Sequence, residues 1–268
     1  MLKQEEKDFI LENYKAGKSI NSISKEINVS WDTVKRFLRK EEVVLNKKVN
    51  QYQEEQNFDS LFEKVTTSEI AYWLGFLYAD GSIRSDSRNE ISLVLQEKDF
   101  EAVKSFHSFC NNKNKIRENV TKRNGKEYLS YASSFSSKKV KENLIKLGCL
   151  PKKSLILQCP TEEQVPQEFI YDFIRGYFDG DGYARYDVNK HKYDIVLLGT
   201  ENFLIKLAER INILDKVKIQ PTQTKAFSLS LYGKENVYDF LKKLYDNNNI
   251  ALKRKKEIFL QANGDSNR

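Results

Sequence analysis

Two aspartates in similar surroundings are the strongest candidates for chemistry in this sequence. Asp80 and Asp181 lie 101 residues apart, and each follows an apolar run and precedes a glycine. The runs predict two buried helices that end at these acids, with Gly81 and Gly182 in the left-handed conformation just beyond each helix. A carboxylate at a helix C-terminus opposes the helix macrodipole. A local rule that is broken twice in the same way indicates function.

Small residues spaced four apart give each predicted helix a smooth face. They are Gly75 and Ala79 in the first helix and Gly176 and Gly180 in the second, and such faces allow two helix backbones to approach closely. If the helices pack along these faces, both aspartates reach one place. Two facing carboxylates repel unless a cation lies between them, and Mg²⁺ prefers oxygen ligands. The alternative is a pair of ordinary buried helices with acidic C-caps, which the repetition disfavours.

The two motif segments carry a family resemblance. Residues 73–81 (WLGFLYADG) and 174–182 (IRGYFDGDG) resemble the two motifs of single-chain LAGLIDADG homing endonucleases, and the resemblance covers about residues 57–260. It implies an α+β fold in which two pseudo-symmetric αββαββ halves pack through the motif helices. The resemblance also implies that the chain acts on DNA.

The resemblance also assigns roles to the motif residues. It implies that Asp80 and Asp181 bind the catalytic divalent metal, for which we expect Mg²⁺. The backbone carbonyls of Ala79 and Gly180 are expected to assist as further oxygen ligands. Hydrolysis of a phosphodiester needs a nucleophilic water, a metal that stabilises charge on the phosphate, and a route for protonating the leaving oxygen.

Basic residues after the last helix of each half are expected to complete the catalytic site. Lys153 lies 73 residues after the first aspartate and Arg254 lies 73 residues after the second, so the resemblance points to Lys153 and to Arg254 or Lys255. Gln96, at the end of a predicted strand, resembles a water-positioning residue of the family. The counterpart region 199–200 lacks a glutamine, so we expect unequal sites. A solvated surface charge is an equally open interpretation of each basic residue.

Composition favours a polyanionic partner without identifying it. The 268 residues include 45 Lys and Arg against 38 Asp and Glu, a net charge of +7. Three cysteines without metal-ligand spacing predict reduced thiols, and two histidines are too few for a histidine-rich metal site. The N-terminal residues predict no signal peptide, and no apolar run reaches the roughly 18 residues of a membrane span. We therefore expect a cytoplasmic protein.

Residues 1–42 predict a helix-turn-helix domain. Asn28 can take the left-handed turn conformation, Val29 fills the core and Ser30 caps the last helix. The spacing resembles the three-helix DNA-binding domains of site-specific recombinases and many regulators, although similar modules also bind partners other than DNA. The candidate contacts to the major groove are Trp31, Asp32, Thr33, Lys35 and Arg36, and those to phosphate are Arg39 and Lys40.

The remaining chain divides into a polar linker and two repeated halves. We assign residues 43–56 to the linker, 57–160 to the first half and 161–268 to the second. A short amphipathic helix is predicted over 58–65. In chain order, the first half is then expected to form hairpin 82–96, helix 99–110, a hairpin with a type I′ turn at 122–126 and helix 137–147; the second is expected to form hairpin 183–198, helix 202–213, a hairpin around 220–225 and helix 234–246.

Further cations lie on strands that should cover DNA. Those proposed to contact bases or phosphates are Arg84, Arg88, Lys122, Arg123, Arg185, Lys190, Lys192 and Lys225. Together these features predict a monomeric, Mg²⁺-dependent endonuclease that cuts double-stranded DNA at a long, partly asymmetric site. Two alternatives stay open: a non-catalytic DNA-binding regulator on the same fold, and an RNA-binding intron splicing helper.

Overall fold

The computed structural model describes residues 2–41, 43, 60–187, 192–246, 248 and 250–266. The chain separates into two compact units, Met1–Glu55 and Gln56–Arg268. The predicted linker 43–56 lies outside the described residues except for Val43. Its assignment therefore stays a prediction.

The first unit consists of three helices, α1 (Gln4–Lys15), α2 (Ile20–Glu26) and α3 (Trp31–Lys40). Asn28 has φ 52°, and the Ser30 hydroxyl accepts a hydrogen bond from the Thr33 amide at 3.2 Å. These two residues turn the chain and cap α3 as the sequence predicts. The small core of this unit is formed by Ile10, Tyr14, Ile23, Val34, Phe37 and Leu38.

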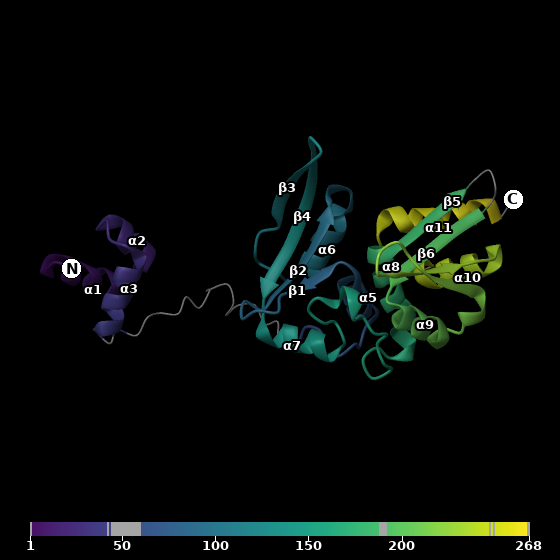
Figure 1. The fold of residues 1–268 in the computed structure, drawn as a ribbon, viewed down its shortest axis with the longest axis horizontal. Coiled ribbons are helices and arrows are strands. Elements are labelled where there is room, and N and C mark those ends of the chain that lie inside the picture. Colours follow the sequence, from purple (N-terminus) through teal and green to yellow (C-terminus); the bar gives the residue numbers. More distant parts are fainter. Residues whose placement is uncertain are drawn as a thin grey trace. The chain divides into compact units, whose positions relative to one another are not determined.

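The second unit is an α+β structure with two four-stranded antiparallel sheets (Figure 1). The first sheet has the order β1-β2-β4-β3, with β1 (Gly81–Ile83), β2 (Glu90–Gln96), β3 (Arg117–Arg123) and β4 (Lys126–Ser136). The second sheet has the order β5-β6-β8-β7, with β5 (Gly182–Asp187), β6 (Lys192–Gly199), β7 (Val217–Pro221) and β8 (Phe227–Leu231). The identical order shows the internal repeat in three dimensions.

Helices cover one face of each sheet and form the contact between the halves. Their bounds are α5 (Ser68–Ala79), α6 (Phe100–Phe109), α7 (Lys138–Lys146), α8 (Ile170–Asp181), α9 (Glu201–Arg210), α10 (Lys234–Tyr245) and α11 (Lys253–Ser266). In β2 the side chains of Ile91, Leu93 and Leu95 are buried, whereas Val94 on the opposite side is exposed. Alternation of this kind is typical of a sheet with one covered face and one solvated face. We call the solvated side of each sheet its open face.

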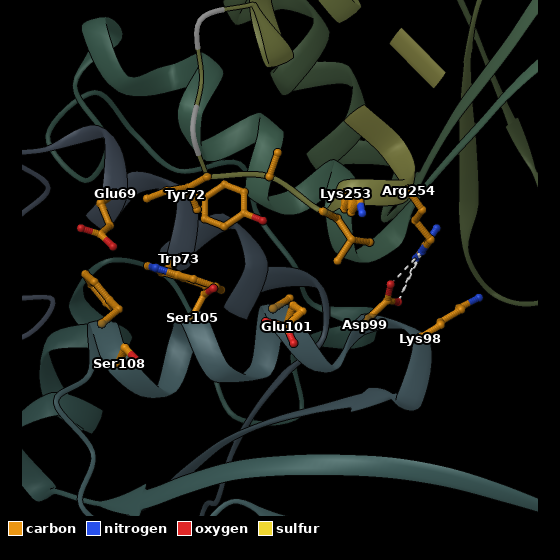
Figure 2. Close-up of a pocket in the computed structure, with 15 residues that line it drawn as sticks. Glu69, Tyr72, Trp73, Lys98, Asp99, Glu101, Ser105, Ser108, Lys253 and Arg254 are labelled. Carbon is orange, nitrogen blue, oxygen red and sulfur yellow. Dashed lines mark hydrogen bonds and ion pairs between the residues drawn. The ribbon is translucent and has the colours of Figure 1, made fainter. Parts of the chain in front are cut away.

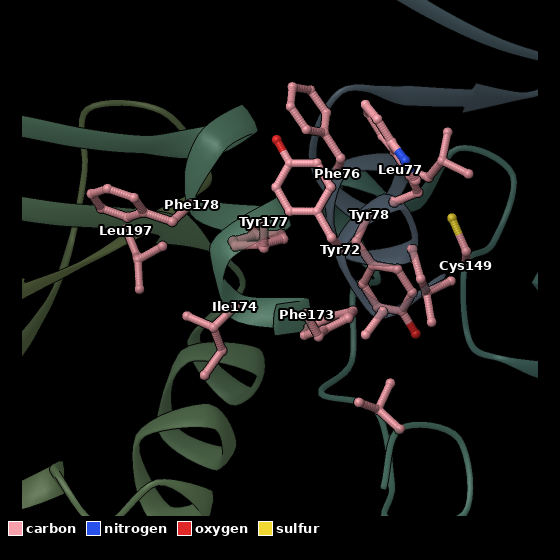
Figure 3. Packing of buried hydrophobic residues seen from close by; sticks show 14 of the residues in the cluster. Tyr72, Phe76, Leu77, Tyr78, Cys149, Phe173, Ile174, Tyr177, Phe178 and Leu197 are labelled. Carbon is pink, nitrogen blue, oxygen red and sulfur yellow. The ribbon is translucent and has the colours of Figure 1, made fainter. Parts of the chain in front are cut away.

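The helices α5 and α8 lie at the centre of the second unit. From Ala71 to Tyr78 every residue of α5 is buried, so this helix has no solvated stripe. Aromatic side chains of both helices gather where they meet (Figure 3). The rings of Tyr78 and Phe173 pack edge to face with their centroids 4.9 Å apart. One apolar core therefore spans both halves.

Two local expectations are wrong, and one helix was missed. Gly81 and Gly182 are not left-handed: Gly81 opens β1, and Gly182 is extended with φ −86°. The helix predicted over 58–65 is replaced by turns and bends over 60–64, where buried Phe62 takes φ 56°, and residues 58–59 lie outside the described part. Helix α11 was not predicted. The type I′ turn is confirmed, because Asn124 and Gly125 have φ 50° and 73°.

Candidate active site

The contact between α5 and α8 is made by backbone atoms. A Cβ placed on Gly75 would come within 1.9 Å of the Phe173 carbonyl oxygen, and one on Gly176 within 1.8 Å of the Tyr72 carbonyl oxygen. Neither position can hold any residue larger than glycine without moving the helices. The predicted contact through small residues is thereby confirmed. The contact also explains why glycine occupies both positions, since only a hydrogen side chain lets the two helix backbones come this close.

This contact brings the two aspartates together. Asp80 directly follows α5 and Asp181 is the last residue of α8. A Cβ on Gly180 would lie 2.3 Å from the Ala79 Cβ and 3.2 Å from an Asp80 carboxylate oxygen. The C-terminal ends of both helices, and both carboxylates with them, therefore meet at one point. Gly81 and Gly182 serve close packing: a Cβ on either would fall within 2.6 Å of the preceding helix.

The surroundings of the two carboxylates disfavour their charged forms. Asp80 keeps an exposed surface and Asp181 is half-buried, but the dense protein around the helix ends limits their hydration. This desolvation raises the pKa of Asp80, although the nearby Lys255 and Lys153 ammonium groups oppose it. Desolvation and then the neighbouring Asp80 carboxylate raise the pKa of Asp181 to about 6. Such a pair attracts a cation.

Two buried lysines lie at equivalent points behind the aspartates. Lys153 donates a hydrogen bond to the carbonyl of Gly81. Lys255 donates to the carbonyls of Gly182 at 2.6 Å and Asp179 at 2.8 Å, and also to that of Phe178. Burial lowers the pKa of Lys255 to about 8. Both ammonium groups therefore fix the backbone immediately around an aspartate.

Lys255, not Arg254, occupies the position equivalent to Lys153. Lys153 and Lys255 bond to the carbonyls of equivalent glycines, whereas Arg254 turns away and pairs with Asp99 of the first half at 3.0 Å (Figure 2). Equal spacing of 73 residues from the aspartates selected Arg254, but the second half has one more residue between its aspartate and the lysine that corresponds to Lys153. Arg254 thus links the two halves beside a cavity of about 670 Å³ between α5, α6 and residues 250–254.

The two halves differ at the position of Gln96. Gly81 pairs with Leu93 in the first sheet, so Gln96 lies three residues further along β2, at the end of the sheet where Asp80 lies. The equivalent pair of Gly182 with Leu197 places Thr200 at the matching position. The Thr200 hydroxyl donates to the Leu157 carbonyl and accepts from the Phe203 amide. It caps α9 and is not available to a water near Asp181.

Asp179 is a buried residue that sequence reasoning missed. Its carboxylate accepts hydrogen bonds from the Tyr72 hydroxyl at 2.8 Å, the Tyr245 hydroxyl at 2.6 Å and the Leu252 amide at 2.6 Å. Burial raises its pKa, and these donors oppose the shift. Leu252 immediately precedes α11, which carries Lys255. An acid directly after the apolar residues Tyr177 and Phe178 of the motif helix, where the first copy has Tyr78, was the available signal.

The cations proposed to contact DNA have different surroundings. Arg84 and Arg88 both pair with Asp86 at 2.9 Å, and Lys122 pairs with Glu127 at 2.9 Å. The exposed Arg185 lies 3.9 Å from Asp187. Arg123 and Lys225 are exposed, Lys192 lies in β6, and Lys190 is outside the described residues.

The candidate contacts of the first unit lie on α3. Trp31 is 41% exposed, and the Lys35 ammonium lies 4.3 Å from the centre of its ring. Thr33 is partly buried and shares a hydrogen bond with the Ser30 hydroxyl. The remaining four candidates, Asp32, Arg36, Arg39 and Lys40, are exposed. An exposed, mostly basic helix face is thus present in this unit.

The second half is similar to a known protein family. Residues 168–245 match the family model of the LAGLIDADG-like domain. These residues form a LAGLIDADG-like domain. The first half repeats its sheet order, and the whole arrangement is similar to the homing endonuclease I-WcaI bound to its DNA recognition sequence, with a TM-score of 0.55 and 13% identity. The match covers 80% of this chain and 93% of that chain. It establishes the LAGLIDADG fold.

Two further similarities are weaker. The N-terminal LAGLIDADG domain of DUF199/WhiA gives a TM-score of 0.44 at 14% identity, over 76% of this chain and 94% of that one. A probable translation initiation factor IF-2 of Methanocaldococcus jannaschii is 25% identical over 232 residues, which are 81% of this chain. The chain spans only 18% of the length of that relative. Within the described ranges, none of the helices combines the length and apolarity that crossing a bilayer requires.

Proposed function

We propose that this chain is a site-specific, metal-dependent endonuclease that cuts double-stranded DNA, as a homing endonuclease does. The observation that supports it is the meeting of Asp80 and Asp181 at the ends of two helices whose backbones touch. An ordinary fold would separate two such carboxylates, because their mutual repulsion and lost hydration are unfavourable. The partner in the structure of I-WcaI is DNA, and a chain of net charge +7 is suited to the same partner.

The donor set fits Mg²⁺. Among the described residues no cluster of three His, Cys, Asp or Glu side chains forms a complete metal site, so a metal here depends on two carboxylates and other oxygens. Mg²⁺ is commonly held by one or two carboxylates together with substrate phosphates. Asp80 and Asp181 would hold it, and the carbonyls of Ala79 and Gly180 would assist, because the last carbonyls of a helix lack intrahelical donors. When bound, the ion supplies Lewis-acid stabilisation of charge on a phosphate.

Other residues of this chain would orient the substrate. The open faces of both sheets carry cations that can hold a duplex by its phosphates. Lys153 and Lys255 keep the backbone around each aspartate in place and add positive charge beside the reacting phosphates. Gln96 would orient a water in the first site, whereas Thr200 at the equivalent position of the second half is engaged in capping α9. We therefore expect the first site to cut faster.

The first unit is proposed to extend the footprint. The basic face of α3 would enter a major groove next to the central site, as the second helix of a helix-turn-helix does. Two halves in one chain supply two sites, so the protein would act as a monomer.

The test begins with targets selected from a randomised duplex library. With Mg²⁺ the protein should linearise a plasmid that carries a selected target, and Asp80→Asn or Asp181→Asn should abolish double-strand cutting while binding persists. Asp239→Asn, at a carboxylate on α10 far along the sequence from either aspartate, is the matched control and should cut normally. Normal cutting by both active-site variants would refute the metal assignment. Tight binding without any cutting by the wild-type chain would instead support a regulator.

A further inference from the structure

One ion pair joins the start of α11 to the first half. The Arg254 guanidinium contacts the Asp99 carboxylate through two nitrogens, with Nε 3.0 Å from Oδ1 and Nη2 3.2 Å from Oδ2. Figure 2 shows this pair at one end of the cavity. Of the hydrogen bonds and ion pairs made by the described residues of α11, it is the one that reaches the first half. Two such contacts fix the relative orientation of both groups as well as their distance.

Asp99 is the fixed member of the pair. It directly precedes α6, where aspartate is a favoured N-cap, yet its side chain makes no capping hydrogen bond. It is 9% exposed, and Val103 and Phe106 of the same helix are fully buried in the core. A buried carboxylate needs a partner, and Arg254 supplies it from 155 residues away. The carboxylate is thus directed to the second half and not to its own helix.

Arg254 is the member whose position the pair determines. Its side chain is 44% exposed, and it lines the cavity of about 670 Å³. The Ile250 carbonyl and the Leu252 amide, just before it in the chain, both bond to side chains of α8 in the same half. The pair therefore supplies the polar hold that this segment receives from the first half.

The pair lies between residues of the two active sites. Asp99 is three residues beyond Gln96, and Arg254 immediately precedes Lys255. Burial raises the pKa of Asp80 and the nearby lysines lower it, and Asp99 and Arg254 add effects of opposite sign. Both charges are therefore within electrostatic reach of the site, where they oppose each other.

The repeat does not reproduce this link in the opposite direction. The positions equivalent to Arg254 and Asp99 hold Lys152 and Phe203. Lys152 is exposed, and Phe203 is apolar and fully buried. A phenylalanine cannot accept an ion pair, so the link runs from the first half to the second site and not the reverse.

We propose that Asp99 and Arg254 are positioning residues for the second site, around Asp181. Their pair holds the first turn of α11, so that Lys255 keeps its contacts with the carbonyls beside that aspartate. Cutting by the second site then depends on a carboxylate supplied by the first half, whereas cutting by the first site has no such dependence on the second half. This inference rests on the proposed function and specifies how one half supports the other in it.

The experiment measures cutting of each strand separately in the full chain. A duplex that carries a selected target is labelled on one strand or the other and cut with Mg²⁺ by Arg254→Ala, by Asp99→Ala and by the double variant. Lys152→Ala is the matched control, because it removes the equivalent cation of the first half. Gln96→Ala identifies the strand that the first site cuts. Because the Arg254 side chain is half-exposed, its loss should leave the fold intact.

A second measurement follows α11 without metal or DNA. The amides of Lys255 and Lys256 donate to the Leu252 carbonyl at 2.9 Å and 3.1 Å, and hydrogen exchange at these amides reports how firmly the first turn is held. Both amides should exchange faster in Arg254→Ala than in wild type, and at the wild-type rate in Lys152→Ala. Unchanged exchange in Arg254→Ala would overturn the inference.

The three variants of the pair should slow one strand at least about tenfold, because a small displacement at a reacting centre costs up to about 100-fold. That strand should be the one that Gln96→Ala leaves unaffected, and Lys152→Ala should not change the ratio of the two rates. The double variant removes two opposite charges, so recovery of the wild-type rate in it would show that charge and not position matters. That recovery, or equal slowing of both strands, would overturn the inference and leave the endonuclease proposal standing. Failure of wild type to cut any selected duplex would overturn both.

Discussion

Replacing Gly176 with alanine tests the contact on which the site depends. The new Cβ would lie 1.8 Å from the Tyr72 carbonyl oxygen, and real Cβ atoms essentially never come nearer than 3.0 Å to another heavy atom. The helices must therefore separate by about 1.2 Å, the difference between these distances. The obstacle is backbone of the central helix, which cannot turn away as a side chain can. Overpacking of this kind costs about 3 kcal/mol.

Alanine also has a favourable effect that must be subtracted. In a helix interior it is about 1 kcal/mol better than glycine, so the net destabilisation should be about 2 kcal/mol. Gly75→Ala should behave in the same way. Because both substitutions separate the same two helices, the double variant should lose less than the sum of the single losses.

Urea unfolding followed by tryptophan fluorescence measures this loss. The chain has two tryptophans, of which Trp73 is 1% exposed in the core and Trp31 is exposed in the first unit. A Trp31→Phe background therefore restricts the signal to the unit that contains the helix pair. A Gly176→Ala protein as stable as its parent, or more stable, would refute the backbone contact. Strict additivity with Gly75→Ala would refute the shared origin of the two losses.

Three other predictions concern the site, its support and the first unit. The pKa of Asp181 is about 6 in the folded chain against 3.8 ordinarily, so the folded state holds more protons between these values. Without metal, the free energy of unfolding should then fall as pH rises from about 4 to 6. The shift sets an upper limit of about 3 kcal/mol, and the loss should be smaller because solvent screens a half-buried group. Asp181→Asn should flatten this dependence in urea unfolding at each pH. Tyr72→Phe removes a donor from the buried Asp179 carboxylate and should cost about 2 kcal/mol, whereas Tyr171→Phe, at a more exposed hydroxyl, should cost little; equal losses would contradict the network. Replacing Lys35, Arg36, Arg39 and Lys40 with alanine should lower the salt slope of DNA binding by up to about 3.6 units without moving the cut; an unchanged slope would mean that α3 serves another partner.

Local chemistry made much of the fold predictable. Asn28 and Ser30 define the turn before α3, and Asn124-Gly125 defines a type I′ hairpin, because few other residues tolerate those backbone angles. The spacing of Gly75 and Gly176 with their small neighbours predicted the helix pair. In each case the relevant partners are within a few residues or on a repeated helix face.

The errors involve partners that are distant in the sequence. Lys255 was not separated from Arg254 because the deciding acceptor, the Gly182 carbonyl, lies 73 residues away. The network of Asp179 joins residues up to 107 positions apart. Gly81 and Gly182 were correctly selected as special, but the reason is the nearness of the preceding helix and not a left-handed angle. Spacing alone does not distinguish these two reasons.

Because of the Asp179 network, each half can pair with the other half but not with a copy of itself. Under the 101-residue repeat, Tyr72 corresponds to Phe173 and Asp179 corresponds to Tyr78. A homodimer built from two second halves would bury two Asp179 carboxylates opposite phenylalanine, each short of one hydroxyl donor. A homodimer of first halves would contain neither the Asp179 carboxylate nor the Leu252 amide that donates to it. The two halves of the chain therefore cannot replace each other, and chimeric proteins made by exchanging halves must exchange residues 72 and 179 together.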